Sequence, residues 1–310
     1  MRALVTGASG CLGRALVEVL EGQGRRLRTT ARQPVALPDF HAADLVEADL
    51  RPLVEGVDTV FHCAALSSAW GTRAAFQAAN VQATARLLAA AEAAGVARFV
   101  FASSPSIYAD GTDRLDLAED APLPARPLSL YAASKRAAEA LVLGHRGAMT
   151  CTAIRPRAIY GRHDRALLPR LIEAMRRGRV PMIRGGRALI DLTHRHDAAR
   201  AMVLAASGPR GGVWNVTSGE AFAFRELAAL IGRQGGLAFR TVNLPYRPAR
   251  WLAHLSEGLA RLRGGAEPRL TLQAVASLGT SLTLDIAAAR RDLGYRPQVA
   301  LAEGMVECFA

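Results

Sequence analysis

The sequence contains a single lysine, Lys135, although lysine and arginine together number 39. The other basic residues are all arginines, so a lysine at this one position indicates a role that guanidinium does not fill. Lysine offers a compact ammonium with three donors and a pKa that can move, whereas arginine is a planar fork that stays charged. We therefore expect Lys135 to have a chemical role.

Cysteines and long apolar runs are also scarce. The four cysteines are widely spaced and form no C-x-x-C pair or Cys/His cluster, which excludes a disulfide framework or a zinc site of the usual spacing. No charge-free apolar run approaches the ~18 residues of a membrane span, and the sequence opens directly on a strand-like segment without the pattern of a signal peptide. We expect a cytoplasmic protein without stable membrane insertion.

Acidic residues are too few to balance the charge of the arginines, and aromatic residues are also scarce. The formal net charge is +12 and aromatics make up only 5% of the chain. The arginines are scattered and the aromatic residues too few for a platform that stacks bases, so a nucleic-acid partner is not expected. The charge instead favours anionic small molecules.

The first 23 residues have the pattern of a nucleotide-binding unit. An apolar strand at 2–6 leads into the glycines Gly7, Gly10 and Gly13, and an amphipathic helix follows at 14–23. Such glycines allow a tight turn, let the backbone approach a pyrophosphate and let the helix pack closely on the strand. Amides at the helix start then bind the anion.

The end of the second predicted strand, 26–31, indicates which dinucleotide is bound. NAD-binding proteins usually end this strand with Asp or Glu, whose carboxylate holds the ribose 2′-hydroxyl. Here Arg32 follows the strand, and a basic group accommodates a 2′-phosphate. We expect NADP(H) to be preferred; because Arg32 is one arginine among many, NAD(H) stays open.

Tyr131 and Lys135 lie four residues apart in an alanine-rich segment, so a helix places both side chains on one face. An ammonium beside a phenol should lower the phenol pKa from about 10 and suit it to acid/base work. A strand at 98–102 delivers Ser104 to the edge of a parallel sheet where ligands bind, and its hydroxyl can donate to a substrate oxygen.

Other segments are expected either to contribute residues to this edge of the sheet or to have only a structural role. Asp44 follows a short third strand near the expected adenine, and the small residues Ala64 and Ala65 follow a fourth strand, where a dinucleotide can lie close. His62 is expected to be a satisfied strand-end residue without a catalytic role. A helix is predicted over 72–94, with Asn80 an exception on its alanine-rich surface.

These motifs together resemble the extended short-chain dehydrogenase/reductases, within the NAD-dependent epimerase/dehydratase superfamily, over essentially the whole chain. The resemblance rests on T-G-x-x-G-x-x-G from Thr6, Tyr131-x-x-x-Lys135, and Arg155-Pro156-x-x-x-Tyr160-Gly161. It implies a doubly wound parallel sheet of about seven strands, the Rossmann α/β fold, with a smaller C-terminal substrate-binding region. It also implies that Tyr131 is the general acid/base, that Lys135 binds the nicotinamide ribose and tunes Tyr131, and that Ser104 polarises the carbonyl.

Within that family, the segments 61–71 and 103–106 look closer to the 3β-hydroxysteroid dehydrogenase and β-ketoacid reductase branch. The resemblance implies hydride transfer between NADP(H) and a ketone or secondary alcohol on a mainly apolar substrate. The alternatives are a nucleotide-sugar epimerase or dehydratase with tightly bound NAD, and a nucleotide-sensing protein without catalysis. A small-molecule substrate is the expected partner, and a homodimer stays open.

The resemblance assigns further residues to binding. The Rossmann domain is expected over 1–161, with 188–217 and 280–294 returning to it, and 162–310 is expected to be mainly substrate-binding. Cofactor contacts are expected from a set of turn and strand-end residues: Gly7, Ser9, Gly10, Cys11, Leu12, Gly13, Arg32, Asp44, Leu45, Ala64, Ala65, Tyr131, Lys135 and Pro156. Substrate contacts are expected from five more: Ser67, Trp70, Ser106, Arg157 and Tyr160.

Two C-terminal features have several explanations. A helix over 247–263 gathers Trp251 and four leucines on one face with arginines elsewhere; we expect it to pack over or beside the substrate cleft, while a membrane-surface contact or a place in the core stay open. His194 and His196 resemble a metal pair, but Asp197 sits where a helix N-cap belongs, so no metal is expected.

Overall fold

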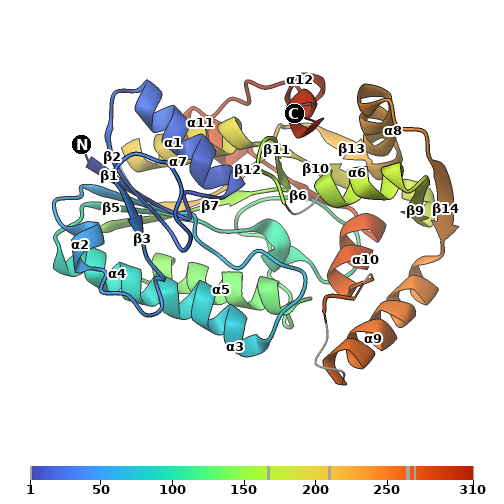
Figure 1. Cartoon of the computed structure of the whole chain (residues 1–310), viewed down its shortest axis with the longest axis horizontal. Coiled ribbons are helices and arrows are strands. Elements are labelled where there is room, and N and C mark those ends of the chain that lie inside the picture. Colours follow the sequence, from blue (N-terminus) through green and yellow to red (C-terminus); the bar gives the residue numbers. More distant parts are fainter. Residues whose placement is uncertain (1, 166–167, 209–210, 263–265, 269, 310) are drawn as a thin grey trace.

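The computed structural model describes residues 2–165, 168–208, 211–262, 266–268 and 270–309. At its centre lies a seven-stranded sheet in the order β12-β7-β5-β4-β1-β2-β3 (Figure 1), and every strand pair in it is parallel. The predicted doubly wound parallel sheet is confirmed. Its strands are β1 (Arg2–Thr6), β2 (Arg26–Ala31), β3 (Phe40–Ala42), β4 (Thr59–His62), β5 (Arg98–Ala102), β7 (Thr150–Pro156) and β12 (Gly212–Val216).

Helices cover both faces of this sheet, which explains why its central strands are apolar almost without interruption. One face carries α1 (Cys11–Gly22), α7 (Arg195–Ser207) and α11 (Ala287–Leu293), and the other carries α2 (Arg51–Val54), α4 (Ala83–Ala93) and α5 (Leu130–Leu143) (Figure 1). Each face has its own apolar core, built on the first side around α1 and α7 and on the second around α4 and α5.

The helix predicted over 72–94 is three consecutive segments. These are α3 (Arg73–Phe76), the π-helix η1 (Gln77–Gln82) and α4. Asn80, the exception in this alanine-rich segment, lies on η1 with its side chain buried. π-helical turns frequently occur at functional sites, and this one lies beside α5.

The remaining elements form a second, smaller body of structure. A four-stranded sheet has the order β13-β10-β15-β6, and two strand pairs, β8 with β11 and β9 with β14, lie nearby. The strands are β6 (Arg114–Leu117), β8 (Ile159–Tyr160), β9 (Arg179–Ile183), β10 (Leu189–Asp191), β11 (Thr193–His194), β13 (Ala221–Ala223), β14 (Arg240–Leu244) and β15 (Leu282–Leu284). The helices are α6 (Leu168–Arg176), α8 (Phe224–Gly235), α9 (Tyr246–Leu262), α10 (Leu272–Gly279) and α12 (Leu301–Val306), with 3₁₀ turns η2 (Pro105–Tyr108), η3 (Arg184–Gly186) and η4 (Glu307–Phe309).

The chain crosses between the two bodies more than once. Strand β6 comes from the first half of the chain but belongs to the smaller sheet, whereas β12 comes from the second half and completes the larger one. Strand β1 lies between β2 and β4, so the strand order reverses there. In open parallel sheets, ligands bind in the crevice at the carboxyl ends of the strands where the order reverses.

Helix α9 forms where the arginine-rich amphipathic pattern predicted it, although Arg263 lies outside the described residues. Its small residues Ala249 and Ala253 pack against α10 in a cluster with Ile183 and Val275. We expected this helix to pack over or beside the substrate cleft. Its alanine side packs on α10, because small side chains allow the closer approach, and its face of Trp251 and leucines is exposed. Within the described ranges, no helix has both the length and the apolar character needed to cross a bilayer.

Candidate active site

The turn between β1 and α1 admits only glycine at two places. Gly7 has a φ of +65°, and a Cβ there would lie 2.6 Å from the backbone nitrogen of Ala64 on β4's following loop. A Cβ at Gly13 would lie 2.2 Å from the carbonyl oxygen of Gly7, so α1 can pack closely on β1 only without a side chain there. Helix α1 begins after Gly10, which provides no side-chain cap for the first amides. This cradle fits the pyrophosphate of a dinucleotide.

Polar residues surround the far end of this cradle. Arg32 is exposed directly after β2, and Arg14 Nε donates to the carbonyl oxygen of Ser9, 3.4 Å away. Asp44 is exposed, and its Oδ1 accepts from the backbone nitrogen of Val46 at 2.8 Å, which fixes the turn after β3. Asp44 is thus engaged in its own turn, whereas the Arg32 side chain is exposed at the end of β2.

Ser104 and Tyr131 meet through a side-chain hydrogen bond. Strand β5 ends just before Ser104, whose Oγ accepts from the Ser106 backbone nitrogen at 3.2 Å and donates to Ser106 Oγ at 3.0 Å. Ser129 caps α5 by accepting from Ala132 N at 3.1 Å, which places Tyr131 in the helix's first turn. The three hydroxyls of Tyr131, Ser104 and Ser106 thus form a connected chain, able to donate a proton and to hold an oxygen.

Lys135 is buried against the end of β5. Its ammonium donates to the carbonyl oxygen of Ala102 and lies 4.0 Å from the centre of the Phe101 ring. Burial lowers the pKa of Lys135 to about 7, and Cys63 and Glu139 oppose the change. Burial raises the pKa of Tyr131, and the hydrogen bond from Ser104 lowers it. The lowering by Lys135 that we expected is wrong for this structure, because neither cause of the tyrosine's shift comes from the ammonium.

Asn80 ties backbone segments together, as an amide within an alanine-rich helix suggests. Its Oδ1 accepts from the backbone nitrogen of Leu66 at 2.7 Å, and its Nδ2 donates to the Leu66 carbonyl at 3.2 Å and to Ser134 Oγ at 2.9 Å. Ser134 in turn donates to the carbonyl oxygen of Tyr131 at 2.9 Å. One amide therefore ties the loop after β4 to the helix of Tyr131. The available signal was an amide in an otherwise alanine-rich helix.

A small cavity of about 20 Å³ continues from Ser106. Arg157 lines it, and the Nε atom of Arg157 is buried without a hydrogen-bond partner, as is Oε1 of Gln273. Burial lowers the pKa of Arg157, and the carboxylate of Asp191 opposes this. The full lining mixes polar and small apolar side chains: Ser106, Ala109, Leu128, Arg157, Gln273, Ala276, Ser277, Thr280 and Leu282.

The residue pattern of the first two thirds decides the family. A family model described as NAD dependent epimerase/dehydratase matches residues 3–217. The chain belongs to this family.

Relatives in the family include reductases. A 4-hydroxy-2-methyl-3-oxo-4-farnesyl-3,4-dihydroquinoline-1-oxide ketoreductase of Stigmatella aurantiaca is 38% identical over 317 residues, covering 98% of this chain and 95% of the relative. A 2-alkyl-3-oxoalkanoate reductase of Stenotrophomonas maltophilia is 33% identical over 329 residues, covering 98% and 97%. The solved structure of MoeE5 in complex with UDP-glucose and NAD is 30% identical with a TM-score of 0.81, covering 100% and 97% of the two chains.

These similarities identify an NAD(P)-dependent enzyme of the short-chain dehydrogenase/reductase type, as the sequence resemblance predicted. The cradle of Gly7, Gly10 and Gly13 agrees with this family, because a dinucleotide needs the close backbone approach that those positions allow. Tyr131 and Ser104, the residues predicted to act on the substrate oxygen, are joined by a side-chain hydrogen bond.

Three residues predicted to contact substrate lie away from the cavity. Ser67 is exposed in the loop after β4, and Trp70, farther along this loop, has the Arg261 guanidinium 5.6 Å from its ring centre. Tyr160 is fully buried, and its ring packs edge-on against His194. The prediction for Tyr160 is wrong, because β8 directs this side chain into the core beneath α12.

His62 agrees with the structural role that the sequence suggested. It is fully buried between Thr6 Oγ1 at 2.7 Å and Thr84 Oγ1 at 2.9 Å, so it links β1, β4 and α4. Burial lowers its pKa to about 3, with a smaller contribution from Lys135. A neutral imidazole with both nitrogens engaged stabilises the sheet and leaves no free group for catalysis.

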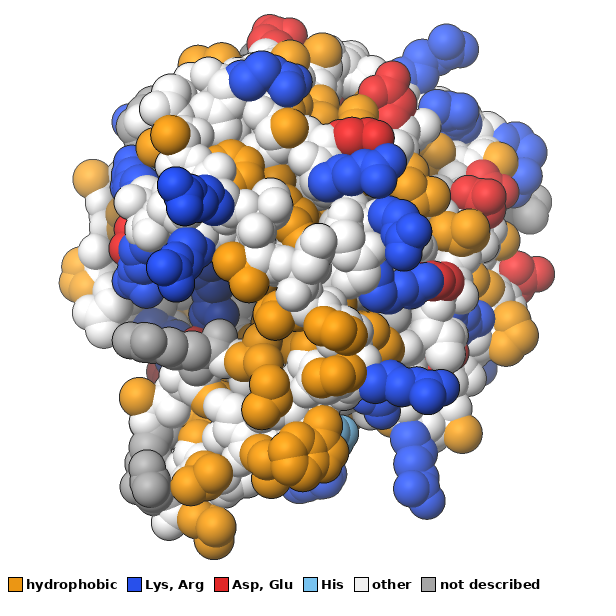
Figure 2. Space-filling model, turned by 90° about the vertical axis from the view of Figure 1, so that its right-hand side faces the viewer, with side chains coloured by type: hydrophobic (Ala, Val, Ile, Leu, Met, Phe, Trp, Pro, Cys, Tyr) orange, Lys and Arg blue, Asp and Glu red, His pale blue; other side chains and the backbone are white. Residues whose placement is uncertain are grey.

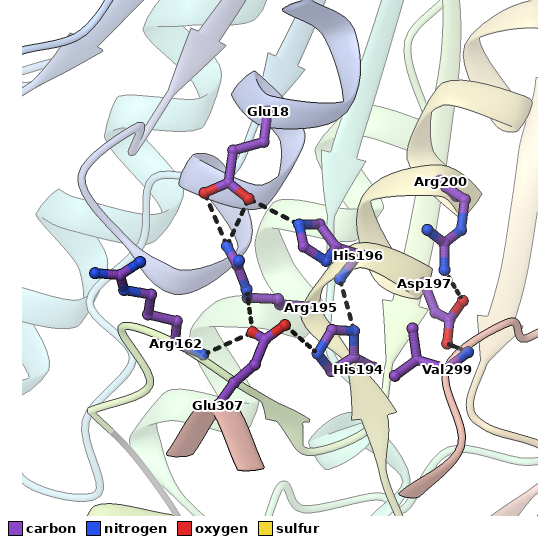
Figure 3. A network of polar contacts seen from close by, with 9 residues as sticks. All are labelled: Glu18, Arg162, His194, Arg195, His196, Asp197, Arg200, Val299 and Glu307. Carbon is purple, nitrogen blue, oxygen red and sulfur yellow. Dashed lines mark hydrogen bonds and ion pairs between the residues drawn. The ribbon is translucent and has the colours of Figure 1, made fainter. Parts of the chain in front are cut away.

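The histidine pair lies in a polar network at the C-terminal end of the chain (Figure 3). His194, not Asp197, is the N-cap of α7, accepting from the His196 backbone nitrogen. The N-cap prediction for Asp197 is wrong: its carboxylate lies inside the helix and accepts from the backbone nitrogens of Gln298 and Val299 and from Arg200. Asp197 thus anchors the segment that leads to α12.

Among the described residues, one group could hold a metal ion: His194, His196 and Glu307. Figure 3 shows Arg195 between the carboxylates of this network, with Nε 2.8 Å from Glu307 and NH1 2.9 Å from Glu18. His196 Nε2 lies 2.7 Å from the same Glu18 carboxylate. A guanidinium already neutralises these acids, so we interpret the network as a tie between α1, α7 and the C-terminus.

Proposed function

We propose that the protein is an NADP(H)-dependent reductase of a ketone on a mainly apolar substrate that also carries an acidic group. The observation that carries this proposal is the continuous chain from Tyr131 through Ser104 and Ser106 to the cavity where Arg157 lies. A proton donor at one end and a cation at the other suit a short 3-oxo acid head group. The apolar residues of the lining would contact the carbon chain of such a substrate.

In this proposal, a reduced dinucleotide whose pyrophosphate lies in the glycine cradle would supply the hydride from its nicotinamide ring. As the carbonyl carbon gains the hydride and its C=O double bond becomes single, the oxygen takes the proton of the Tyr131 hydroxyl. In the substrate-free structure the single Ser104 proton is donated to Ser106 Oγ, 3.0 Å away. On substrate binding, Ser104 would turn this proton to the carbonyl oxygen and stabilise the developing negative charge, while the Ser106 hydroxyl would donate to Ser104 Oγ and keep it oriented. General acid catalysis of this kind contributes roughly 100- to 10,000-fold.

The cofactor is proposed to lie between the β1 and β4 loops. Backbone atoms of the turn would hold the pyrophosphate, with Asp44 and Leu45 near the adenine. The exposed Arg32 would contact the 2′-phosphate of NADP(H), because its guanidinium is at the end of β2 and a carboxylate is absent from that position. A planar guanidinium pairs with a phosphate in bidentate fashion.

Arg157 is proposed to bind the acidic group of the substrate. A buried cation with an unpaired Nε costs free energy unless an anion compensates it. The relative from Stenotrophomonas maltophilia is named for a 3-oxoalkanoate, which has a carboxylate two carbons from the ketone carbon. That spacing suits a head group with the ketone at Ser104 and Tyr131 and the acid toward Arg157.

The test is NADPH oxidation measured against four substrate classes: 3-oxo acids, their methyl esters, hydroxysteroids or oxosteroids, and nucleotide sugars. We expect turnover with 3-oxo acids and less with the matched esters. Arg157→Gln should raise KM for the acid at least about tenfold while leaving KM for the ester unchanged. Arg179→Gln, an exposed arginine on β9, is the matched control. Turnover of nucleotide sugars alone would contradict the proposal.

A further inference from the structure

One face of α9 carries five large apolar side chains that are exposed in the described structure. Their exposed fractions are 64% for Trp251, 51% for Leu252, 45% for Leu255, 48% for Leu259 and 88% for Leu262. At 100° per residue these positions fall on one side of the helix. The opposite side holds Ala249 and Ala253, which pack on α10. Figure 2 shows hydrophobic side chains gathered over α9 at the bottom of the view, with Lys/Arg side chains beside them.

The exposed charged side chains of α9 are all positive. Arg247, Arg250 and Arg261 are exposed along one edge of the apolar face. The acidic residue of the helix, Glu257, is buried on the packed side, where its carboxylate accepts from the Leu272 backbone nitrogen at 2.8 Å and from Arg261 at 3.3 Å. The apolar face of α9 is therefore bordered by cations without an exposed acid on the same helix.

Helix α9 also contacts segments that border the proposed substrate cavity. Helix α10, against which α9 packs, provides Gln273, Ala276 and Ser277 to the cavity lining. At the other end of α9, Arg261 lies over the ring of Trp70 in the loop after β4, the loop that Asn80 ties to the helix of Tyr131. Both ends of α9 are thus connected to segments that border the site.

We propose that the exposed face of α9 docks the protein onto the surface of an anionic lipid bilayer. Leucines and a tryptophan beside arginines are the composition of helices that lie in a membrane interface, where apolar side chains enter the acyl boundary and cations meet lipid phosphates. The net charge of +12 adds a long-range attraction to such a surface.

A second copy of the chain fits this face less well. Two α9 faces brought together would place arginines near arginines, and each protein carries the same net charge of +12. Like charges across a contact are destabilising, and no exposed acid on α9 offsets them. An anionic surface has the complementary charge. The further idea that docking presents an apolar substrate to the cavity rests on the proposed function, whereas docking itself does not.

The experiment is co-sedimentation of the full chain with vesicles of phosphatidylcholine, with and without phosphatidylglycerol. We expect binding only to the anionic vesicles, weakened by added salt. The combined variant Leu252→Gln, Leu255→Gln and Leu259→Gln should bind at least about tenfold more weakly, because it removes apolar area from the interface. A matched control changes three exposed leucines elsewhere to Gln: Leu115, Leu141 and Leu204, exposed by 51%, 41% and 36%.

A second pair of variants tests the charge. Arg247→Gln with Arg250→Gln should weaken binding to anionic vesicles, while Arg26→Gln with Arg179→Gln, exposed arginines of other elements, should not. Wild-type protein that stays in the supernatant, or an α9 leucine variant that binds as wild type does, would overturn the proposal. The proposal would also be overturned if the wild type were a dimer by light scattering, did not bind vesicles, and became a monomer only in the α9 leucine variant. The occupant of the face would then be a second copy of the chain.

Turnover of a short, water-soluble ketone separates this proposal from the proposed function. The α9 side chains lie outside the hydroxyl chain of the site, so all variants should keep wild-type turnover of that substrate. Vesicle binding without any ketone turnover would support membrane docking and contradict the proposed reductase function. Ketone turnover without vesicle binding would support the reductase function and contradict membrane docking.

Discussion

The Lys135 ammonium lies 4.0 Å from the centre of the Phe101 ring and donates to the Ala102 carbonyl oxygen, so the chain's single lysine is enclosed by the end of β5. The side chain is almost fully buried. A compact ammonium at the end of a thin stem fits between ring and carbonyl, whereas a planar guanidinium is wider and needs more than one acceptor. The position explains why arginine, used everywhere else, does not occur here.

Lys135→Arg should therefore lose activity although the charge is kept. We expect turnover to fall by roughly 100-fold or more, because the wider group displaces β5 and the Ser104 hydroxyl that follows it. Steady-state NADPH oxidation measures the loss, and circular dichroism checks the fold. The matched control is Arg136→Lys on the same helix, which should stay near wild type. An active arginine variant would show that the ammonium's shape is irrelevant.

The low pKa of Lys135 also predicts a dependence of stability on pH. Its pKa is about 7 in the folded protein and has an ordinary value of 10.5. Below pH 7 the lysine is charged in both states and the cost of burying its charge is complete. Between pH 7 and 10.5 the folded protein holds fewer protons than the unfolded chain, so stability rises with pH.

Relative to Lys135→Met, the wild type should gain free energy of unfolding from pH 7 to 9, by at most about 1.4 kcal/mol per pH unit. Urea unfolding of both proteins at each pH measures this, and the difference cancels the other titrating groups that they share. A difference that stays constant over the range would mean that Lys135 keeps its proton in the folded protein.

Tyr131→Phe should remove the proton donor and little else. The ring remains next to Phe76, 6.5 Å away between centres, so the fold and dinucleotide binding should be preserved. Turnover should fall by roughly 100- to 10,000-fold. Fluorescence titration with NADPH supplies the binding control. If the Phe variant kept more than about a tenth of the wild-type rate, a different group would have to donate the proton.

Asn80→Ala should disturb the site indirectly, since Asn80 holds the Leu66 loop against α5. The variant leaves buried partners of three hydrogen bonds unsatisfied, and stability should fall by about 1–3 kcal/mol. We expect a lower kcat with little change in KM, which a purely structural loss would not produce at temperatures where the protein stays folded. Gln82→Ala, exposed on the same π-helix, is the control, and equal effects of both variants would argue against a positioning role.

The glycine cradle and the spacing of Tyr131 and Lys135 could be predicted because each depends on neighbours close in the chain, whereas the parallel sheet was implied by the family resemblance. The sequence did not predict particular side-chain contacts between distant segments. Asn80 reaches Leu66 and Ser134 only because η1 is a π-helix beside α5. Tyr160 enters the core because β8 pairs with β11, and this pairing joins segments more than 30 residues apart.

The amphipathic pattern of 247–263 is likewise compatible with two ways of packing the helix. Periodicity gives the face on which Trp251 and the leucines lie, but it does not say whether that face or the alanine face packs on α10. The structure selects the alanine face at Ala249 and Ala253. A pKa also depends on burial in three dimensions, so the expected effect of Lys135 on Tyr131 could not be tested from spacing alone.

The proposed preference for NADP(H) is argued from one exposed side chain, Arg32 at the end of β2. If its guanidinium pairs with the 2′-phosphate, Arg32→Ala should weaken NADPH binding by about 1.5–3 kcal/mol, the contribution of a charge-assisted contact, and leave NADH nearly unchanged. Arg32→Asp should go further and favour NADH, because a carboxylate accepts from the ribose hydroxyls and repels a phosphate.

Dissociation constants of both dinucleotides, measured for the wild type and the two Arg32 variants at one fixed salt concentration, check this expectation, since exposed phosphate contacts are screened. Arg26→Ala, at the opposite end of the same strand, is the matched control and should change neither constant. Equal weakening of NADH and NADPH by Arg32→Ala would mean that Arg32 contacts a part common to both dinucleotides. If the wild type binds NADH as tightly as NADPH, the proposed 2′-phosphate contact is wrong. The alternative of an NAD-using nucleotide-sugar epimerase or dehydratase would then be favoured.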